Sequence, residues 1–181
     1  TGCDIHIWQR DLYESEAAYA NFGLIGGLLQ EAHDKKYPPA TIEELMQQEL
    51  NVGALSDTLS SIAWQNYTGS TVNHVVFERQ TIGETDFKTI KAGNARRSAS
   101  SSDCYIELYI GRQTYSGGSL KSHLFSEIYA RTYYGSNYAS KSAVLWDQTQ
   151  KISVKDEQSI NAARQIVRTA IVNIMNKFLQ N

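Results

Sequence analysis

The sequence predicts an α+β protein: an antiparallel meander sheet packed by a long C-terminal amphipathic helix and by helices from the N-terminal half. In residues 104–110 and 120–134, aliphatic or small side chains alternate with aromatic or charged ones. A period of two residues is typical of a strand with one buried face. Residues 156–179 repeat apolar side chains every three or four positions, as an amphipathic helix does. We expect one domain over 1–181, because no boundary or internal repeat interrupts these patterns.

The two long strands predict a sheet with unlike faces. The aliphatic face carries Cys104, Ile106, Leu108, Ile110, Leu120, Leu124, Ile128 and Ala130. The opposite face carries Tyr105, Glu107, Tyr109, His123, Phe125, Glu127, Tyr129, Arg131 and Tyr133. A turn at 135–137 and a strand at 143–146 continue the meander, and shorter extended segments are expected at 4–8 and 73–80.

The C-terminal helix supplies the cover for the aliphatic face. Its apolar stripe consists of Ile160, Ala163, Val167, Ala170, Ile171, Ile174 and Phe178. Asp156 at its start and Lys177 near its end suit the helix dipole. Burial of each larger side chain stabilises the fold by about 1.5–3 kcal/mol before ordering costs, so this stripe must lie on an apolar surface.

The N-terminal half predicts shorter helices. Residues 12–29 are helical or irregular, with a glycine-containing segment at 22–29 that we interpret as a short helix packed on the sheet. Thr41 and Glu44 form a capping box at the start of the next helix, and a further helical segment covers 54–64. Residues 83–102 are rich in Ser, Gly and Asn, and predict an exposed, mobile loop with at most a short helix or strand near 87–90.

Composition excludes several classes of protein. The 181 residues carry a net charge of −2 with a pI near 6.1, whereas nucleic-acid-binding domains are normally basic. No apolar run is long enough to span a bilayer. The four histidines lack the local pairing of a zinc site, so neither a metal nor another cofactor is expected.

Two cysteines, Cys3 and Cys104, leave three alternatives open. They are buried free thiols, or a disulfide formed in an oxidising compartment, or Cys3 carries a lipid. Thr1-Gly2-Cys3 fits the last positions of the bacterial lipoprotein cleavage box, although a processed lipoprotein begins at its cysteine. The chain has no initiator Met, so we expect that an upstream segment has been removed.

No motif of a known catalytic class is present. The arrangement with the most catalytic character is His123 beside Glu107 or Glu127, which would suit a small periplasmic or secreted hydrolase. The structural alternative is that Glu107 or Glu127 pairs across the strands with Arg131 or Lys121, as part of the protein surface.

The tyrosine-bearing face has two interpretations. Helices from residues 12–64 cover it as a second core layer, or it stays open and binds a partner. In the second case the binding residues are Tyr105, Tyr109, Phe125, Tyr129, Arg131 and Tyr133.

The order of elements resembles that of small bacterial envelope lipoproteins of the curli-assembly and penicillin-binding-protein-activator type. The resemblance rests on Thr1-Gly2-Cys3, the segment beginning at Phe22, the strand after Asp103, Leu145-Trp146 and the terminal helix. It implies a non-enzymatic accessory protein of the periplasm that works through contact with an envelope protein, without nucleic acid. Membrane association would come only from a lipid on Cys3, where Asp4 resembles an inner-membrane retention signal.

Overall fold

The structure, a computed structural model, describes residues 2–10, 38–117 and 121–181. Its strands are β1 (Cys3–Gln9), β2 (Val72–Phe77), β3 (Cys104–Gly117), β4 (Ser122–Tyr134) and β5 (Asn137–Thr149). Its helices are α3 (Ile42–Leu50), α4 (Val52–Leu59), α5 (Trp64–Thr68), α6 (Glu84–Ala92) and α7 (Glu157–Gln180). The elements expected over 12–29 and the position of Leu120 lie outside the described residues.

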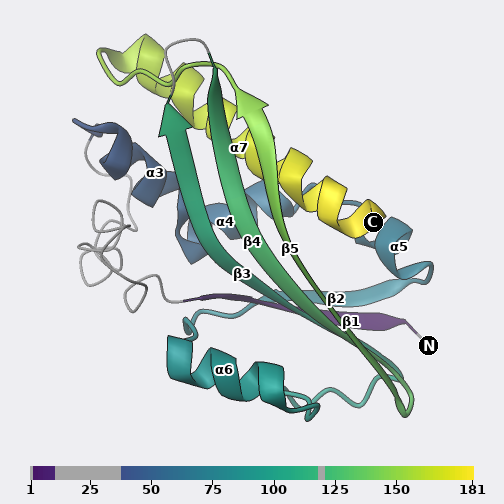
Figure 1. Cartoon of the computed structure of the whole chain (residues 1–181). Helices are drawn as coiled ribbons and strands as arrows, with labels where there is room; N and C mark the ends of the chain where they lie inside the picture. The colour runs from purple at the N-terminus through teal and green to yellow at the C-terminus, as the bar shows by residue number, and fades with distance from the viewer. Residues whose placement is uncertain (1, 11–37, 118–120) are drawn as a thin grey trace.

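The five strands form one mixed sheet in the order β2-β1-β3-β4-β5 (Figure 1). The predicted meander is confirmed for β3, β4 and β5, which pair antiparallel. The prediction of a purely antiparallel sheet is wrong, because β1 pairs parallel with both β2 and β3. Parallel neighbours need a long crossover connection, and the helical segments between these strands supply it.

The turn between β4 and β5 sets the register of the whole β4–β5 pair. Gly135 has a φ of 56°, a left-handed conformation that glycine adopts without steric cost. Tyr134 pairs with Asn137 across this turn, and the pairing continues without a shift to Ser122 and Thr149. β5 is therefore much longer than the strand predicted over 143–146.

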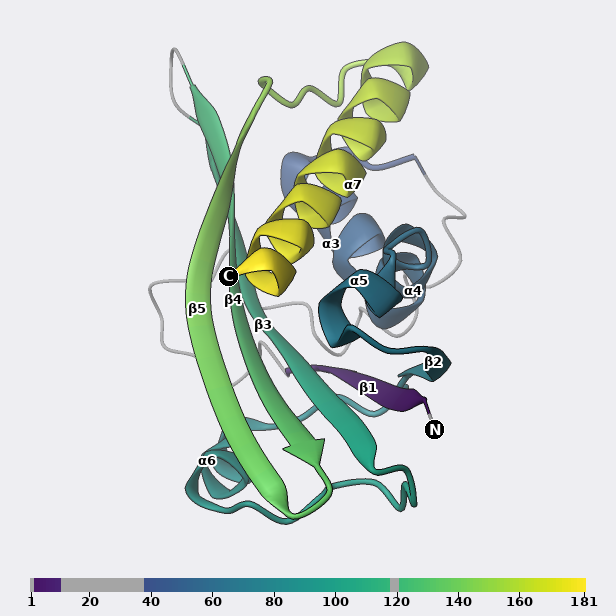
Figure 2. The same cartoon turned by 90° about the vertical axis from the view of Figure 1, so that its right-hand side faces the viewer.

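The long C-terminal helix α7 covers the aliphatic face of the sheet, as predicted. Apolar side chains of β1, β3 and β4 form one cluster with α7, and α3, α4 and α5 complete this layer. Figure 2 shows these helices together on one side of the sheet. The cluster includes Cys104, Leu108, Leu124 and Ile128, the positions expected to meet the helix.

One polar feature starts α3 and another places it against this layer. The Thr41 side chain accepts a hydrogen bond from the Glu44 backbone N–H at 3.2 Å, as the predicted capping box requires. The Glu44 carboxylate, however, accepts from the Ala40 N–H at 2.6 Å, one residue before the cap. The fully buried Glu49 carboxylate accepts from Arg164 Nη1 and Arg168 Nε of α7, each at 2.8 Å. Two cations therefore satisfy one buried carboxylate and join α3 to α7.

Candidate functional site

The face of the sheet opposite α7 is covered over part of its area by α6. Phe87 of α6 lies 5.9 Å from the Tyr109 ring and 5.6 Å from the Tyr129 ring, between centroids. Ile90 and Trp8 are buried in the same cluster. Figure 2 shows α6 on the other side of the sheet from α3, α4 and α5. The described helices of residues 42–68 therefore do not cover the tyrosine-bearing face, contrary to one of our two interpretations.

The segment predicted as a mobile loop, 83–102, has defined contacts in the structure. A helix does occur near 87–90, and it extends over Glu84–Ala92. After it, the Arg97 N–H donates to Glu107 at 2.6 Å and the Ser98 N–H donates to the Tyr105 hydroxyl at 3.1 Å. The sheet supplies these acceptors, so the local composition of the segment could not reveal them.

A buried ion pair lies under α6. Glu107 of β3 is fully buried and Arg131, directly opposite on β4, is 2% exposed. Arg131 Nε donates to the Glu107 carboxylate at 2.7 Å, and the Tyr109 hydroxyl donates to it at the same distance. Charges can be buried when they are paired and fully hydrogen-bonded, as here. The expected pairing of Glu107 with Arg131 across the strands is thereby confirmed, but the pair is buried and does not lie at the surface as expected.

Arginines from the sheet hold both ends of α6. Arg131 donates to the carbonyls of Ile90 and Ala95, each at 2.9 Å, at the C-terminal end of the helix. At the other end, Arg10 donates to Glu84 at 2.7 Å and lies 3.8 Å from the Phe87 ring centroid. Arginine at a helix C-terminus satisfies carbonyls that lack partners in the helix. Helix α6 is therefore held on this face by ionic and hydrogen-bonding contacts of the arginines as well as by apolar contacts.

The tyrosines below α6 do not titrate near neutral pH. Burial, together with the neighbouring Glu107 carboxylate, raises the pKa of Tyr105 and Tyr109 above the ordinary tyrosine value. The same two causes raise the pKa of Tyr133 to about 12. The Tyr109 and Tyr133 hydroxyls donate hydrogen bonds in a buried network, and the Tyr105 hydroxyl accepts one from Ser98. Because they stay protonated, these hydroxyls do not serve as proton acceptors for a reaction.

Most of the binding residues expected from the sequence are thus inaccessible. Tyr105, Tyr109, Tyr129, Tyr133 and Arg131 are all buried, and only Phe125 is half-buried. The sequence contained a signal for this cover, since an amphipathic helix over 84–92 places two large apolar residues three apart. The polar stretch that follows obscured that signal.

Beyond α6 the same face stays open, at a group of side chains that we call the open strip: His123 and Phe125 of β4 with Val144 and Trp146 of β5. Val144 is 68% exposed and Trp146 is 52% exposed. The His123 and Trp146 rings meet edge to face at 5.2 Å. If the two strands are paired residue by residue from the turn at Gly135, Trp146 falls opposite Phe125. The sequence therefore contained the information needed to predict this strip.

The structure does not assemble the predicted histidine–carboxylate pair. His123 and Glu127 lie four residues apart on β4, which is about 13 Å along the strand. Glu107 lies opposite Arg131, eight residues from His123 on β4, and is therefore about 26 Å from the histidine. Proton transfer needs contact within about 3 Å, directly or through one water. Glu107 is bound by Arg131, and Glu127 lies 3.1 Å from Arg10. A hydrolase site at His123 with either carboxylate is therefore not formed.

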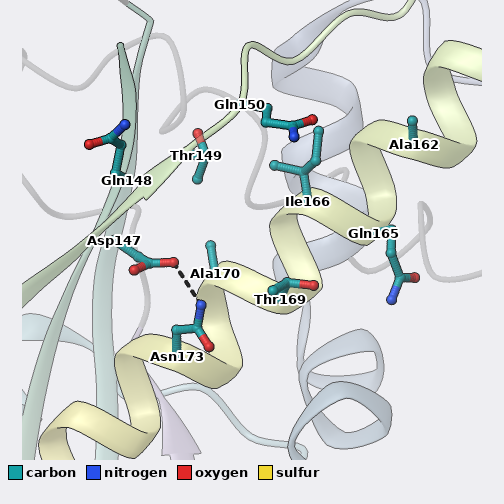
Figure 3. Close-up of a pocket in the computed structure, with 10 residues that line it drawn as sticks. All are labelled: Asp147, Gln148, Thr149, Gln150, Ala162, Gln165, Ile166, Thr169, Ala170 and Asn173. Carbon is teal, nitrogen blue, oxygen red and sulfur yellow. Dashed lines mark hydrogen bonds between the residues drawn. The ribbon is translucent and has the colours of Figure 1, made fainter.

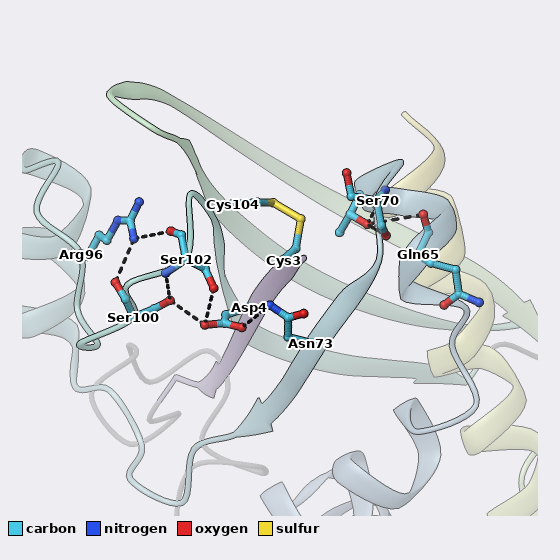
Figure 4. The surroundings of a disulfide bond; sticks show 10 residues. Cys3, Asp4, Gln65, Ser70, Asn73, Arg96, Ser100, Ser102 and Cys104 are labelled. Atoms are coloured by element: carbon cyan, nitrogen blue, oxygen red, sulfur yellow. Dashed lines mark hydrogen bonds between the residues drawn. A yellow bond between two sulfur atoms is a disulfide. The ribbon is translucent and has the colours of Figure 1, made fainter. Parts of the chain in front are cut away.

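Cys3 and Cys104 form a disulfide between β1 and β3, where they are paired neighbours with a Cα–Cα distance of 4.5 Å (Figure 4). Both residues are buried. Of the three alternatives, this is the one that the structure contains. While the bond is intact, the sulfur of Cys3 cannot carry a lipid.

Beside the disulfide, Asp4 organises the chain that leads into β3. Its carboxylate accepts from the hydroxyls of Ser100 at 2.7 Å and Ser102 at 2.9 Å, as Figure 4 shows. Partial burial alone would raise the pKa of Asp4, but these hydrogen bonds, with one from Asn73, hold it below the ordinary value. The Ser-rich stretch is thereby tied to β1.

A groove of about 430 Å³ lies between the end of β5 and α7 (Figure 3). Most of its accessible lining is apolar, with contributions from Ala162, Ile166 and Ala170 of α7. Uncharged polar residues also line it, among them Thr149 and Gln150 at the end of β5 and Gln165, Thr169 and Asn173 of α7. Asp147 at the rim accepts a hydrogen bond from Asn173 at 3.0 Å. No sequence motif marks this groove, because it exists only where strand and helix approach each other.

Neither a metal site nor a membrane span is found in the described part of the chain. No group of three or more His, Cys, Asp or Glu side chains could hold a metal ion among residues 2–10, 38–117 and 121–181. Over the same residues, none of the helices combines the length and apolar character needed to cross a bilayer.

Comparison with known proteins places the chain in no family. No family model and no curated protein matches it. Among solved structures, it is similar to the hypothetical protein CT253 from Chlamydia trachomatis, with 9% identity, coverage of 99% of this chain and 94% of that one, and a TM-score of 0.46. It is also similar to the lipoprotein GNA1162 from Neisseria meningitidis, with 10% identity, coverage of 96% and 99%, and a TM-score of 0.36. Neither is described as a curli-assembly or penicillin-binding-protein-activator protein, and no residue role is carried over.

Proposed function

We propose that this chain is a non-enzymatic accessory protein of the bacterial cell envelope that acts by binding another envelope protein through the open strip. The observation that carries the proposal is the exposure of Val144 and Trp146 beside Phe125, next to the part of the same face where Trp8, Tyr109 and Tyr129 are buried with α6. Contiguous exposed apolar side chains mark interaction sites, and tryptophan is among the residues that dominate binding energies.

The covered region supports a binding role over a catalytic one. Its ionisable groups, Glu107 and Arg131, are paired and buried, so substrate cannot reach them. His123 has aromatic neighbours in Phe125 and Trp146, and neither Glu107 nor Glu127 is positioned to make it a general base. Among the described residues, the open strip carries the two most exposed large apolar side chains, Val144 and Trp146.

The disulfide supports a periplasmic location, because such bonds persist in oxidising compartments. Lipid attachment at Cys3 is the competing proposal, and the two are mutually exclusive at one sulfur. Mass spectrometry of the N-terminal peptide from the native protein distinguishes them. We expect the peptide to be released from a Cys104 peptide on reduction, whereas a diacylglyceryl mass on Cys3 would contradict the disulfide.

Site-specific photo-crosslinking tests the binding function. A photoreactive amino acid at Val144 should yield a discrete adduct in the envelope of the native bacterium, and the same group at exposed Lys88 of α6 should not. Adding Trp146→Ser should reduce the Val144 adduct, since loss of a tryptophan anchor weakens binding by about 2 kcal/mol or more, roughly thirtyfold. Equal adducts from Val144 and Lys88, or none from Val144, would refute the proposal.

A further inference from the structure

Strand β5 ends the sheet, and its outer side is unpaired over the described chain. Its residues pair with β4 alone, over the full range Asn137–Thr149. No hydrogen bond between the β5 backbone and the backbone of another described element occurs apart from this ladder. Proteins usually shorten, cover or charge such edges, because an open edge is a template for another strand.

The backbone groups on this edge can be assigned to particular residues. The Gly135 N–H donates to Asp103 O at 2.8 Å, so the adjacent Tyr134 backbone faces away from β3 and toward β5. Tyr134 and Asn137 are therefore a hydrogen-bonded pair, and in an antiparallel ladder every second residue bonds to the partner strand. The backbone groups of the odd-numbered residues of β5 thus bond to β4. The N–H and C=O groups of the even-numbered residues, including Ser142, Val144 and Trp146, point away from the sheet.

One side-chain hydrogen bond to the edge agrees with this assignment and occupies one of its outward carbonyls. Lys177 Nζ of α7 donates to Trp146 O at 2.8 Å and to Asp147 Oδ1 at 2.9 Å. A carbonyl within reach of that lysine must face outward. An incoming strand has to displace this one donor, and the backbone of Ser142 and Val144 is free of such contacts in the described chain.

The two sides of the edge offer different surfaces. On one side stand the exposed Val144 and Trp146 side chains of the open strip. On the other lies the groove between β5 and α7, where the hydroxyl of Thr149 is buried and makes no hydrogen bond within the described chain (Figure 3). A strand laid along β5 would direct alternate side chains to these two sides.

We infer that β5 is a docking edge at which an extended segment of the partner protein adds as a sixth strand. Main-chain hydrogen bonds to the even-numbered residues hold the segment, and its side chains alternate. Apolar residues of the segment lie beside Val144 and Trp146. Uncharged polar residues face the groove, where the Thr149 hydroxyl lacks a partner within the described chain. This inference rests on the proposed function and names the mode of contact.

A second copy of the chain fits this edge less well. Antiparallel pairing of two β5 strands puts both α7 helices on the same side of the joined sheet. Helix α7 lies over β5, with Lys141 Nζ 4.2 Å from the Phe178 ring centroid. Two helices about 10 Å wide cannot both lie over strands that are about 4.8 Å apart. A peptide segment carries no such helix.

Proline on the edge tests the inference. Ser142→Pro removes one outward N–H and adds a ring at the edge, while the hydrogen bonds to β4 remain. Ser142→Ala is the matched control, and thermal unfolding with circular dichroism confirms that both variants fold. Val144→Pro is a second edge variant, to be used if Ser142→Pro unfolds.

The probe is a displayed library of random peptides of about nine residues, which span roughly 30 Å when extended, selected against the full chain. We expect selected peptides to alternate apolar and polar residues and to slow amide hydrogen exchange at Ser142, Val144 and Trp146. Their affinity should fall at least about tenfold in the proline variant and stay unchanged in the alanine control. Equal affinity for the proline variant, protection elsewhere, or no selected binder would overturn edge docking.

Two further outcomes separate this inference from the proposed function. If the Val144 crosslink persists in Ser142→Pro but is lost in Trp146→Ser, the open strip binds a partner without strand addition, and only the edge inference fails. If sedimentation shows a dimer of the full chain that Ser142→Pro dissociates, the occupant is a second copy, and the inference of a partner segment is wrong.

Discussion

One face of the sheet contains two regions that differ in what lies over them. In the first, which we call the sealed region, Glu107 and Arg131 form a buried ion pair beneath α6, surrounded by Tyr105, Tyr109 and Tyr133. Farther along the same strands, Val144 and Trp146 are exposed to solvent. The first region stabilises the fold and the second is available for contact. Residue type alone does not separate them, since both are rich in aromatic side chains.

The largest effect should come from breaking the sealed region. Arg131→Ala leaves the Glu107 carboxylate buried without its cation and removes the donors at the end of α6. Loss of one partner of a buried pair costs about 3–5 kcal/mol. Urea unfolding followed by circular dichroism measures the change.

Arg97→Ala is the matched control for this prediction. Its exposed guanidinium lies 5.8 Å from the Trp8 ring centroid, and its backbone N–H still donates to Glu107 after the substitution. We expect a loss below about 1 kcal/mol. Similar losses for Arg131→Ala and Arg97→Ala would show that the sealed region does not depend on the buried charge pair.

An intermediate effect is expected from high pH, which should act mainly through the buried tyrosines of the sealed region. Tyrosines in the unfolded chain lose their protons near pH 10, whereas the raised pKa values of Tyr105, Tyr109 and Tyr133 keep these groups protonated in the folded state. Above pH 10 the folded state therefore binds more protons than the unfolded state, and stability falls as pH rises.

Urea unfolding at pH 8 and at pH 11, with tyrosinate absorbance at 295 nm, measures this effect. We expect a lower midpoint at pH 11 and delayed ionisation of part of the eleven tyrosines. Tyr133, whose pKa is raised to about 12, should ionise later than tyrosines with an ordinary pKa. Ionisation of all tyrosines in one step near pH 10, with the protein still folded, would contradict burial of the network.

The smallest effect on stability should come from the open strip. Val144→Ser removes an exposed side chain and leaves the β4 ladder intact, so the free energy of unfolding should change by less than about 0.5 kcal/mol. Phe87→Ala in the sealed region is the contrasting variant, at about 3–5 kcal/mol. A large loss for Val144→Ser would mean that the strip is part of the core and not a contact surface.

Much of the architecture could be predicted because it depends on local periodicity. The alternation at 104–110 indicated a buried aliphatic face, and the repeat over 156–179 indicated the helix that covers it. The opposition of Glu107 and Arg131 followed from their places on adjacent strands. The cover over the tyrosines was missed, because Phe87 and Ile90 stand in a polar stretch whose partners lie on distant strands.

The sequence by itself determined which side chains share a face, because side-chain direction repeats every two residues in a strand and every three or four in a helix. Only the tertiary structure decided that β1 runs parallel to its neighbours, that α6 covers part of the tyrosine-bearing face, and that β5 is an edge strand over the described chain. Strand order and the cover on a face depend on contacts between residues far apart in the chain, which local periodicity does not record.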